Sequence, residues 1–294
     1  MNSIFRKVLI GINGVIGYIF KIAVDLCIFR IPSLKPATSQ DIVVSLTSYG
    51  RRVKKNVVFY TIASLLRQTI QPSKIVLWLA EDEWNENSIP QKLRKLQEKG
   101  VEICYCKDLR SYKKLIPSLE KYPFSTIITV DDDMIYSSDT IETLIAAHER
   151  MPNEIICTVA RKPIIEKGLP KKYNEWEDSL ISPFDDNSQG VNLFPVGVGG
   201  VLYPVGSLHD DVVKEYLFMK YCPLADDIWF WFCGWRKHTV KRFVKKRGND
   251  YSFDSLYQYF HKGSALTHAN SQEDQNDVQL KELFRCYNIG EIEN

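Results

Sequence analysis

Three consecutive aspartates, residues 131–133, directly follow the apolar run of residues 125–130. Like charges at such short range oppose ionisation, and the usual remedy in proteins is a hard divalent cation. Mg²⁺ or Mn²⁺ is commonly held by one or two carboxylates, with a diphosphate supplying further oxygens. The alternative is an acidic turn or helix N-cap, because Asp139 and Glu142 follow nearby. The apolar run favours a metal site, since it places the aspartates at the end of a buried strand.

A second carboxylate pair, Asp226 and Asp227, precedes the apolar segment 228–233 and Gly234. Because this segment is apolar all round, it predicts a buried helix with Gly234 as its C-cap. Acids at a helix N-terminus are stabilised by the helix dipole, which explains the pair without a catalytic role. Trp229, inside the segment, either stacks on a sugar ring or packs in the core, and the hydropathy of the segment favours the core.

The segment 195–206 is rich in glycine and includes Gly199 and Gly200. Glycine lets a backbone approach a ligand closely, so such a loop suits a sugar or an acceptor molecule. A bare structural turn is the alternative. No G-x-G-x-x-G or P-loop pattern occurs in the chain, so the sequence predicts neither a dinucleotide site nor a P-loop site.

Strands alternate with helices through the first half of the chain. Apolar β-branched runs predict strands, and apolar residues at helical spacing predict helices. The alternation predicts an α/β fold with a mostly parallel sheet, in which ligands bind beyond the carboxyl ends of the strands. Residues 47–49 after the first strand, Glu81 after the second and Asp131 after the fourth then share one edge. The predicted strands are residues 42–46, 74–79, 101–105 and 125–130, and the predicted helices are residues 57–68, 89–99 and 112–121.

The composition limits the functional classes. The chain has 294 residues, 45% of them hydrophobic, which is ample for a large buried core. Its 38 basic and 36 acidic residues leave a net charge of +2, which argues against a general nucleic-acid binder. Seven cysteines, an odd number without a C-x-x-C pair, predict reduced core residues in a cytosolic compartment.

The N-terminal segment differs from the rest of the chain. Residues 8–29 are apolar over the length that crosses a bilayer, but Lys21 and Asp25 lie inside them. Two interpretations stay open, a hydrophobic helix packed on the domain and an interfacial or weakly spanning membrane helix. The predicted organisation is a helix and linker over residues 1–40 and a domain over residues 41–294, with a nucleotide-binding half at 41–136 and an acceptor half at 137–294.

The segments IVVSLTSYGRR, KIVLWLAEDE, SYKKLIP and TVDDDMIY follow one another along the chain, with the aspartate run after the fourth predicted strand. In this order they resemble bacterial GT-A glycosyltransferases of surface polysaccharide synthesis, whose signature is a D-x-D motif, and the resemblance covers residues 41–276. It implies a GT-A-like, Rossmann-like sheet and a hexosyltransferase that moves a sugar from a UDP-type nucleotide-sugar donor to a glycan or lipid-linked saccharide. The implied setting is capsule, O-antigen or lipopolysaccharide synthesis at the inner face of the cytoplasmic membrane.

The resemblance also implies roles for residues near the donor. Asp133 binds the Mn²⁺ or Mg²⁺ ion together with Asp131, and Asp131 and Asp132 contact the ribose and the waters of the metal. Basic groups on the neighbouring loops are candidates for the diphosphate, because guanidinium and ammonium donors suit phosphate oxygens. A solvated helix start explains Arg51 equally well. The base-facing candidates are Thr47, Ser48 and Tyr49, Glu81 lies at the same edge, and the diphosphate candidates are Arg51, Arg52, Lys113 and Lys114.

On the acceptor side, the resemblance places a general base at the second carboxylate pair. Asp227 is the first choice and Asp226 the second for deprotonating the acceptor hydroxyl. A late histidine often joins the metal shell in this family, which points to His268, because neutral imidazole suits Mn²⁺. A surface histidine is the alternative there, and His261 is the substitute candidate. The candidates for acceptor binding are Gly199, Gly200 and Trp229.

Two other functions compete with this interpretation. A metal-dependent phosphatase or nuclease uses the same aspartates, but it needs further ligands for a two-metal cluster, and no histidine precedes His148. A non-catalytic carbohydrate-binding protein with the same fold is the third class. No nucleic-acid partner is expected.

Overall fold

The computed structural model describes residues 3–27, 30–37, 41–182, 184–252 and 275–287. His268 and His261 lie outside the described residues. The centre of the fold is an eight-stranded sheet in the order β11-β14-β6-β13-β4-β1-β2-β3. Its strands are β1 (Ile42–Thr47), β2 (Lys74–Ala80), β3 (Glu102–Cys106), β4 (Thr126–Thr129), β6 (Ile155–Cys157), β11 (Gln189–Gly190), β13 (Val201–Tyr203) and β14 (Lys241–Phe243).

The sheet is mostly parallel. Strand β1 lies between β2 and β4 and is parallel to both, β3 is parallel to β2, and β14 is parallel to β6. Strand β13 is antiparallel to β4 and β6, and β11 is antiparallel to β14. The predicted α/β class is therefore confirmed. The order β3-β2-β1-β4 is that of a doubly wound sheet, so the carboxyl ends of these strands form one edge where a ligand can bind.

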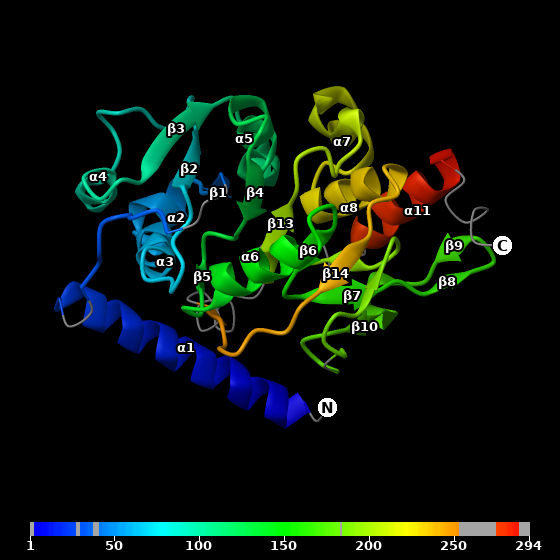
Figure 1. The fold of residues 1–294 in the computed structure, drawn as a ribbon, viewed down its shortest axis with the longest axis horizontal. Helices are drawn as coiled ribbons and strands as arrows, with labels where there is room; N and C mark the ends of the chain where they lie inside the picture. Colours follow the sequence, from blue (N-terminus) through cyan, green and yellow to red (C-terminus); the bar gives the residue numbers. More distant parts are fainter. Residues whose placement is uncertain (1–2, 28–29, 38–40, 183, 253–274, 288–294) are drawn as a thin grey trace.

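Helices cover both faces of the sheet (Figure 1). Successive residues of a strand point to opposite faces, so Val43 and Val44 of β1 enter different cores. The Val43 core includes residues of α5, α7, α8 and α11, and the Val44 core includes residues of α3, α4 and α6. The helices are α1 (Ser3–Asp25), α2 (Gly50–Lys54), α3 (Val57–Leu65), α4 (Gln91–Gln97), α5 (Ile116–Lys121), α6 (Thr140–Arg150), α7 (Glu215–Tyr221), α8 (Asp226–Arg236) and α11 (Gln275–Tyr287).

Short elements complete the fold. Strand β5 (Met134–Ile135) pairs with β15 (Tyr251–Ser252), β7 (Ala160–Lys162) lies between β10 (Glu177–Asp178) and β12 (Phe194–Pro195), and β8 (Ile165–Glu166) pairs with β9 (Leu169–Pro170). The 3₁₀ turns are η1 (Arg110–Lys114), η2 (Tyr173–Glu175), η3 (Gly197–Gly199) and η4 (Asp210–Val213). The eight-stranded sheet itself contains strands from both predicted halves of the domain, residues 41–136 and 137–294.

Several sequence-based expectations need correction. The single helix expected over residues 112–121 is two elements, η1 and α5, because Leu115 between them leaves the helical region with φ −125° and ψ −50°. All seven cysteines are free, but Cys27 and Cys286 are exposed rather than in the core. Within the residues that the structure describes, no helix has both the length and the apolar content to cross a membrane.

Candidate active site

The aspartate run lies beside the loop after β1. Because β1 and β4 are parallel neighbours, their carboxyl ends bring Ser48 and Asp132 together, and the Ser48 hydroxyl donates to Asp132 Oδ2 at 2.5 Å. The Thr61 hydroxyl of α3 donates to the Asp132 carbonyl at 2.8 Å. The predicted meeting of the first loop with the aspartates is therefore present.

Arg52 of α2 holds two of the three aspartates. Its guanidinium donates through Nη1 to Asp132 Oδ1 and through Nη2 to Asp133 Oδ2, the second at 2.8 Å. Burial raises the pKa of Asp132, while Arg52 and the Ser48 hydroxyl oppose that rise. The chain thus supplies a cation of its own beside the aspartates, at the position where the sequence suggested a diphosphate contact.

Lys114 joins the aspartate run to the second carboxylate pair. Its buried ammonium nitrogen lies 2.9 Å from Asp226 Oδ2, 3.2 Å from Asp131 Oδ1 and 3.3 Å from Asp227 Oδ1. Burial by itself lowers the pKa of Lys114, but the three carboxylates outweigh it and hold that pKa well above its usual value. These four residues are called the Lys114 cluster below. The two acidic motifs found in the sequence therefore meet at one site.

Asp227 is the more accessible member of the pair at the start of α8. Its side chain is 27% exposed, against 11% for Asp226. The Gly197 backbone N–H donates to Asp227 Oδ2 at 2.9 Å, which fixes the orientation of the carboxylate. Burial raises the pKa of Asp227 to about 6, with Asp226 and Asp131 adding to the rise and Lys114 opposing it. A carboxylate with this pKa can accept a proton near neutral pH.

Two residues that the sequence analysis did not single out complete the site. A Cβ atom at Gly197 would lie 2.7 Å from Lys114 Nζ and 2.8 Å from Asp227 Oδ1, so a side chain there would displace the charged ends of the Lys114 cluster. The Tyr136 hydroxyl accepts from the Asp131 backbone N–H at 2.8 Å and donates to the Val198 carbonyl at 3.2 Å. The signals for them were the glycine-rich segment and a tyrosine close behind the aspartates.

Gly199 and Gly200 have structural reasons for lacking a side chain. A Cβ atom at Gly199 would lie 2.4 Å from Val159 Cγ2 and 2.6 Å from Thr158 Oγ1. Gly200 has a φ of +91°, which side chains of L-residues disfavour. These contacts are with the protein itself, so an acceptor-binding role of the two glycines stays a prediction.

The Gly199→Ala variant is expected to be less stable than the parent by about 1–3 kcal/mol, because the added methyl group overlaps two side chains in a packed region. Denaturant unfolding followed by circular dichroism measures the change. Gly190→Ala is the matched control, since a Cβ atom there meets only the Asn192 backbone nitrogen at 4.0 Å and the φ of Gly190 is not positive. Equal stability of the Gly199→Ala variant and the parent would contradict the packing account.

Trp229 is a core residue. Its side chain is fully buried, its indole N–H donates to the Val212 carbonyl at 3.1 Å, and its ring packs against Phe232 and Phe218. A buried indole presents no face to a sugar, so Trp229 is not an acceptor-stacking residue in this structure. Core packing, the alternative that the hydropathy favoured, accounts for it.

The other residues predicted to bind the nucleotide-sugar lie on the loops that follow the carboxyl ends of the strands. Tyr49 is exposed, with the Arg52 guanidinium 5.4 Å from its ring centre. The Thr47 hydroxyl donates to the Trp78 carbonyl at 2.9 Å, and Lys113 pairs with Asp108 rather than with the aspartate run. Arg51 in α2 and Glu81 after β2 are exposed. The structure thus brings Ser48 and Arg52 directly to the aspartates and turns Lys113 away from them.

The carboxylates fit a divalent cation that is shared with a diphosphate. Across the described ranges, no group of three or more His, Cys, Asp or Glu residues is placed to hold a metal ion by itself. Mg²⁺ sites in nucleotide enzymes need only one or two carboxylates, because phosphate oxygens and waters complete the shell. Asp131, whose side chain is 32% exposed, and Asp133 meet that requirement. Oxygen donors of this kind suit Mg²⁺ or Mn²⁺, so the metal expected from the sequence stays a prediction.

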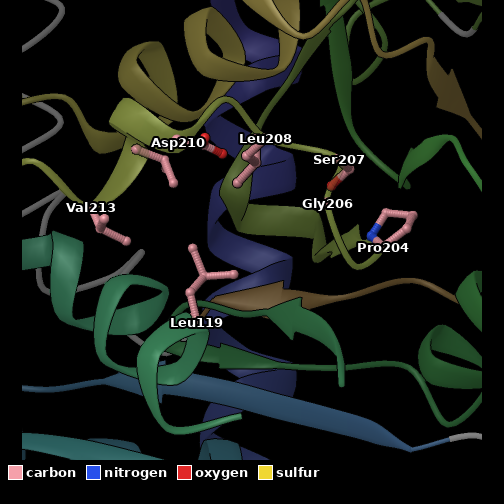
Figure 2. A pocket seen from close by; sticks show the side chains of 8 residues that line it. Leu119, Pro204, Gly206, Ser207, Leu208, Asp210 and Val213 are labelled. Carbon is pink, nitrogen blue, oxygen red and sulfur yellow. The ribbon is translucent and has the colours of Figure 1, made fainter. Parts of the chain in front are cut away.

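A cavity of about 260 Å³ lies apart from this site (Figure 2). Strand β13 begins at Val201 beside Thr129, at the edge that carries the aspartates, and Pro204 follows its other end. The cavity is lined by Pro204 and the chain after it, together with Leu119 of α5. It is therefore at the opposite edge of the sheet and shares no residue with the Lys114 cluster.

Comparison with solved structures finds partial likeness. The structure of S. aureus TarS 1–349 in complex with UDP is 11% identical, over 74% of this chain and 63% of that chain, with a TM-score of 0.47. S. aureus TarS 1–349 alone is 11% identical over 83% of this chain and 72% of that chain, with a TM-score of 0.49. UDP-glucose pyrophosphorylase from Acinetobacter baumanii is 10% identical over 84% of this chain and 99% of that chain, with a TM-score of 0.44. The chain spans less than two thirds of the first of these structures. Neither a protein-family model nor a curated protein sequence matches the chain.

Proposed function

We propose that the protein is a metal-dependent glycosyltransferase that moves a sugar from a UDP-type nucleotide-sugar to a glycan or lipid-linked saccharide. The observation that carries the proposal is the Lys114 cluster. In it Lys114 contacts both Asp131, the carboxylate that we assign to the metal–diphosphate complex, and Asp227, a partly exposed carboxylate with a raised pKa. The sequence resemblance supplies the setting, which is bacterial capsule, O-antigen or lipopolysaccharide synthesis at the inner face of the cytoplasmic membrane.

Each residue of the site has its own role in the proposed sugar transfer. Asp131 and Asp133 would hold Mn²⁺ or Mg²⁺, which neutralises charge on the departing nucleoside diphosphate when bound. Ser48 and Arg52 keep the aspartate run in place through Asp132 and Asp133. Asp227 accepts the proton of the acceptor hydroxyl. The hydroxyl oxygen bonds to the anomeric carbon of the sugar, and the bond from that carbon to the diphosphate oxygen breaks.

Titration with UDP-sugars in the presence of Mn²⁺ tests the proposal through the release of UDP with and without a saccharide acceptor. Release that requires Mn²⁺ and increases with acceptor is expected. Binding of UDP-sugar without release would favour a carbohydrate-binding protein, and hydrolysis of phosphate esters without sugar transfer would favour a phosphatase or nuclease.

The Asp133→Asn variant is expected to lose transfer at Mn²⁺ concentrations that saturate the parent, because a neutral amide is a weaker ligand for a hard cation. EDTA is expected to stop the parent, and added Mn²⁺ to restore it. Asp82→Asn is the control, since Asp82 is an exposed carboxylate beyond β2. Unchanged rates in the Asp133→Asn variant and in EDTA would remove the metal from the mechanism.

A further inference from the structure

Helix α1 presents a row of large apolar side chains to solvent. Val15, Tyr18, Ile19, Ile22 and, one residue past the helix, Leu26 are each between 40% and 66% exposed. Their spacings of three and four residues place them on one face of the helix. A helix of a soluble domain normally turns such a face towards the core. The exposed row therefore requires an explanation.

The opposite face of α1 fixes this orientation. It carries small or β-branched residues, the buried Gly14, Gly17, Ala23 and Val24, which let the helix pack closely on the domain. The end of the helix is tied by Asp25, which accepts from the Tyr60 hydroxyl at 2.8 Å and from Lys92 Nζ at 2.6 Å. Helix α1 lies along the outside of the domain (Figure 1), and these contacts leave its large apolar row exposed.

The charge of this segment selects the partner. Residues 1–35 contain five basic side chains, at Arg6, Lys7, Lys21, Arg30 and Lys35, and one acidic side chain, Asp25. The carboxylate of Asp25 is already paired with Lys92. An anionic lipid surface attracts such a basic segment, whereas a second copy of the same helix would bring like charges together.

We infer that the face of α1 formed by Val15, Tyr18, Ile19, Ile22 and Leu26 docks the protein on an anionic bilayer surface, with the helix in the plane of the interface. Apolar side chains enter the acyl boundary, an aromatic ring suits the headgroup level, and basic groups contact the headgroups. The surface agrees with the membrane location in the proposed function, but it does not depend on the proposed reaction.

Sedimentation of the full chain with lipid vesicles tests this surface. Binding is expected with vesicles of phosphatidylcholine and phosphatidylglycerol, and it is expected to weaken in pure phosphatidylcholine and at high salt. The double variant Tyr18→Glu, Ile19→Glu is expected to bind at least about tenfold more weakly, because two apolar contacts become charges. Phe124→Glu is the matched control, since Phe124 is an 87% exposed apolar residue in the turn between α5 and β4.

The outcomes separate the surface from the reaction. Transfer of the sugar to a soluble acceptor, measured as UDP released, is expected to be the same in the double variant and in the parent. Failure of the parent to bind anionic vesicles, or equal binding by the double variant, would overturn the inference. It would also be overturned if the parent were a dimer in solution that the double variant dissociates without any change in vesicle binding. Normal vesicle binding without sugar transfer would refute the proposed reaction but would still support the membrane-docking surface.

Discussion

Replacing Lys114 with methionine is expected to lower the free energy of unfolding by about 3–5 kcal/mol, because removal of one partner leaves buried charges uncompensated. Lys114 is buried, and its ammonium group lies within 3.3 Å of carboxylate oxygens of Asp131, Asp226 and Asp227. Without it, these carboxylates repel one another at the junction of β4 and α8. Sugar transfer is expected to be lost with the geometry of the site. Denaturant unfolding of parent and variant measures the loss of stability.

The neighbouring Lys113→Met variant is the matched control. Lys113 is equally buried, but its partner Asp108 is 47% exposed and stays hydrated without the lysine. Its loss is expected to cost less than about 1 kcal/mol. The defect of Lys114→Met is expected to shrink as the pH falls from 8 to 5, because the pKa of Asp227, already raised to about 6, rises further without the cation, and a protonated carboxyl carries no charge. Equal stability of the two variants at pH 8 would contradict the central role of Lys114.

The first half of the fold could be predicted because buried parallel strands are continuous apolar runs. Strands β1, β2 and β4, and also the edge strand β3, which is only partly buried, lie within one or two residues of the predicted ranges. The second half gave weaker signals, since β6, β13 and β14 have only three residues each. Strand β14 also contains the buried Lys241 and Arg242. Because these charged residues lie in a basic segment, the sequence did not predict a strand there. Arg242 is tolerated there because it pairs with Glu154.

The site was predicted by residue type, whereas its connections were not. The aspartates after β4 and the pair at the start of α8 were visible as carboxylates at the ends of apolar segments. Their link is Lys114, which lies 113 positions before Asp227 in the chain, and no local pattern encodes a contact at that separation. Lys114 was expected to meet a diphosphate, but three carboxylates already surround it. The sequence therefore identified the charged groups and left their pairing to the fold.

Asp226 and Asp227 at the start of α8 show how the fold distinguishes residues that the sequence does not. Two adjacent acids at a helix N-terminus are chemically equivalent in the sequence, and the helix dipole stabilises both. In the structure, Asp226 is the more buried and lies nearest to Lys114, whereas Asp227 is more exposed and accepts the Gly197 N–H. Burial and position thus favour Asp227 over Asp226 as the proton acceptor of the proposed reaction.

The Asp227→Asn variant is expected to turn over about 10²–10⁴-fold more slowly than the parent while it still binds the UDP-sugar, because an amide cannot accept the proton of the acceptor hydroxyl. The amide oxygen can still accept the Gly197 N–H, so the backbone of η3 is expected to stay in place. Asp226→Asn is the matched control. It is expected to lose stability more than turnover, since Asp226 contacts Lys114 and is less exposed than Asp227.

The pH dependence of turnover distinguishes a base from a helix cap. A base works only when deprotonated, so turnover of the parent is expected to rise as the pH increases through about 6, the pKa to which burial raises Asp227. The groups that share its surroundings, Lys114, Asp226 and Asp131, stay in place in the Asp227→Asn variant, so a step caused by any of them would remain there. The variant is expected to lose the step. Initial rates at saturating UDP-sugar between pH 5 and pH 8 test this. Near-normal turnover of the variant with the step in its pH profile intact would show that Asp227 is a helix cap and not the base.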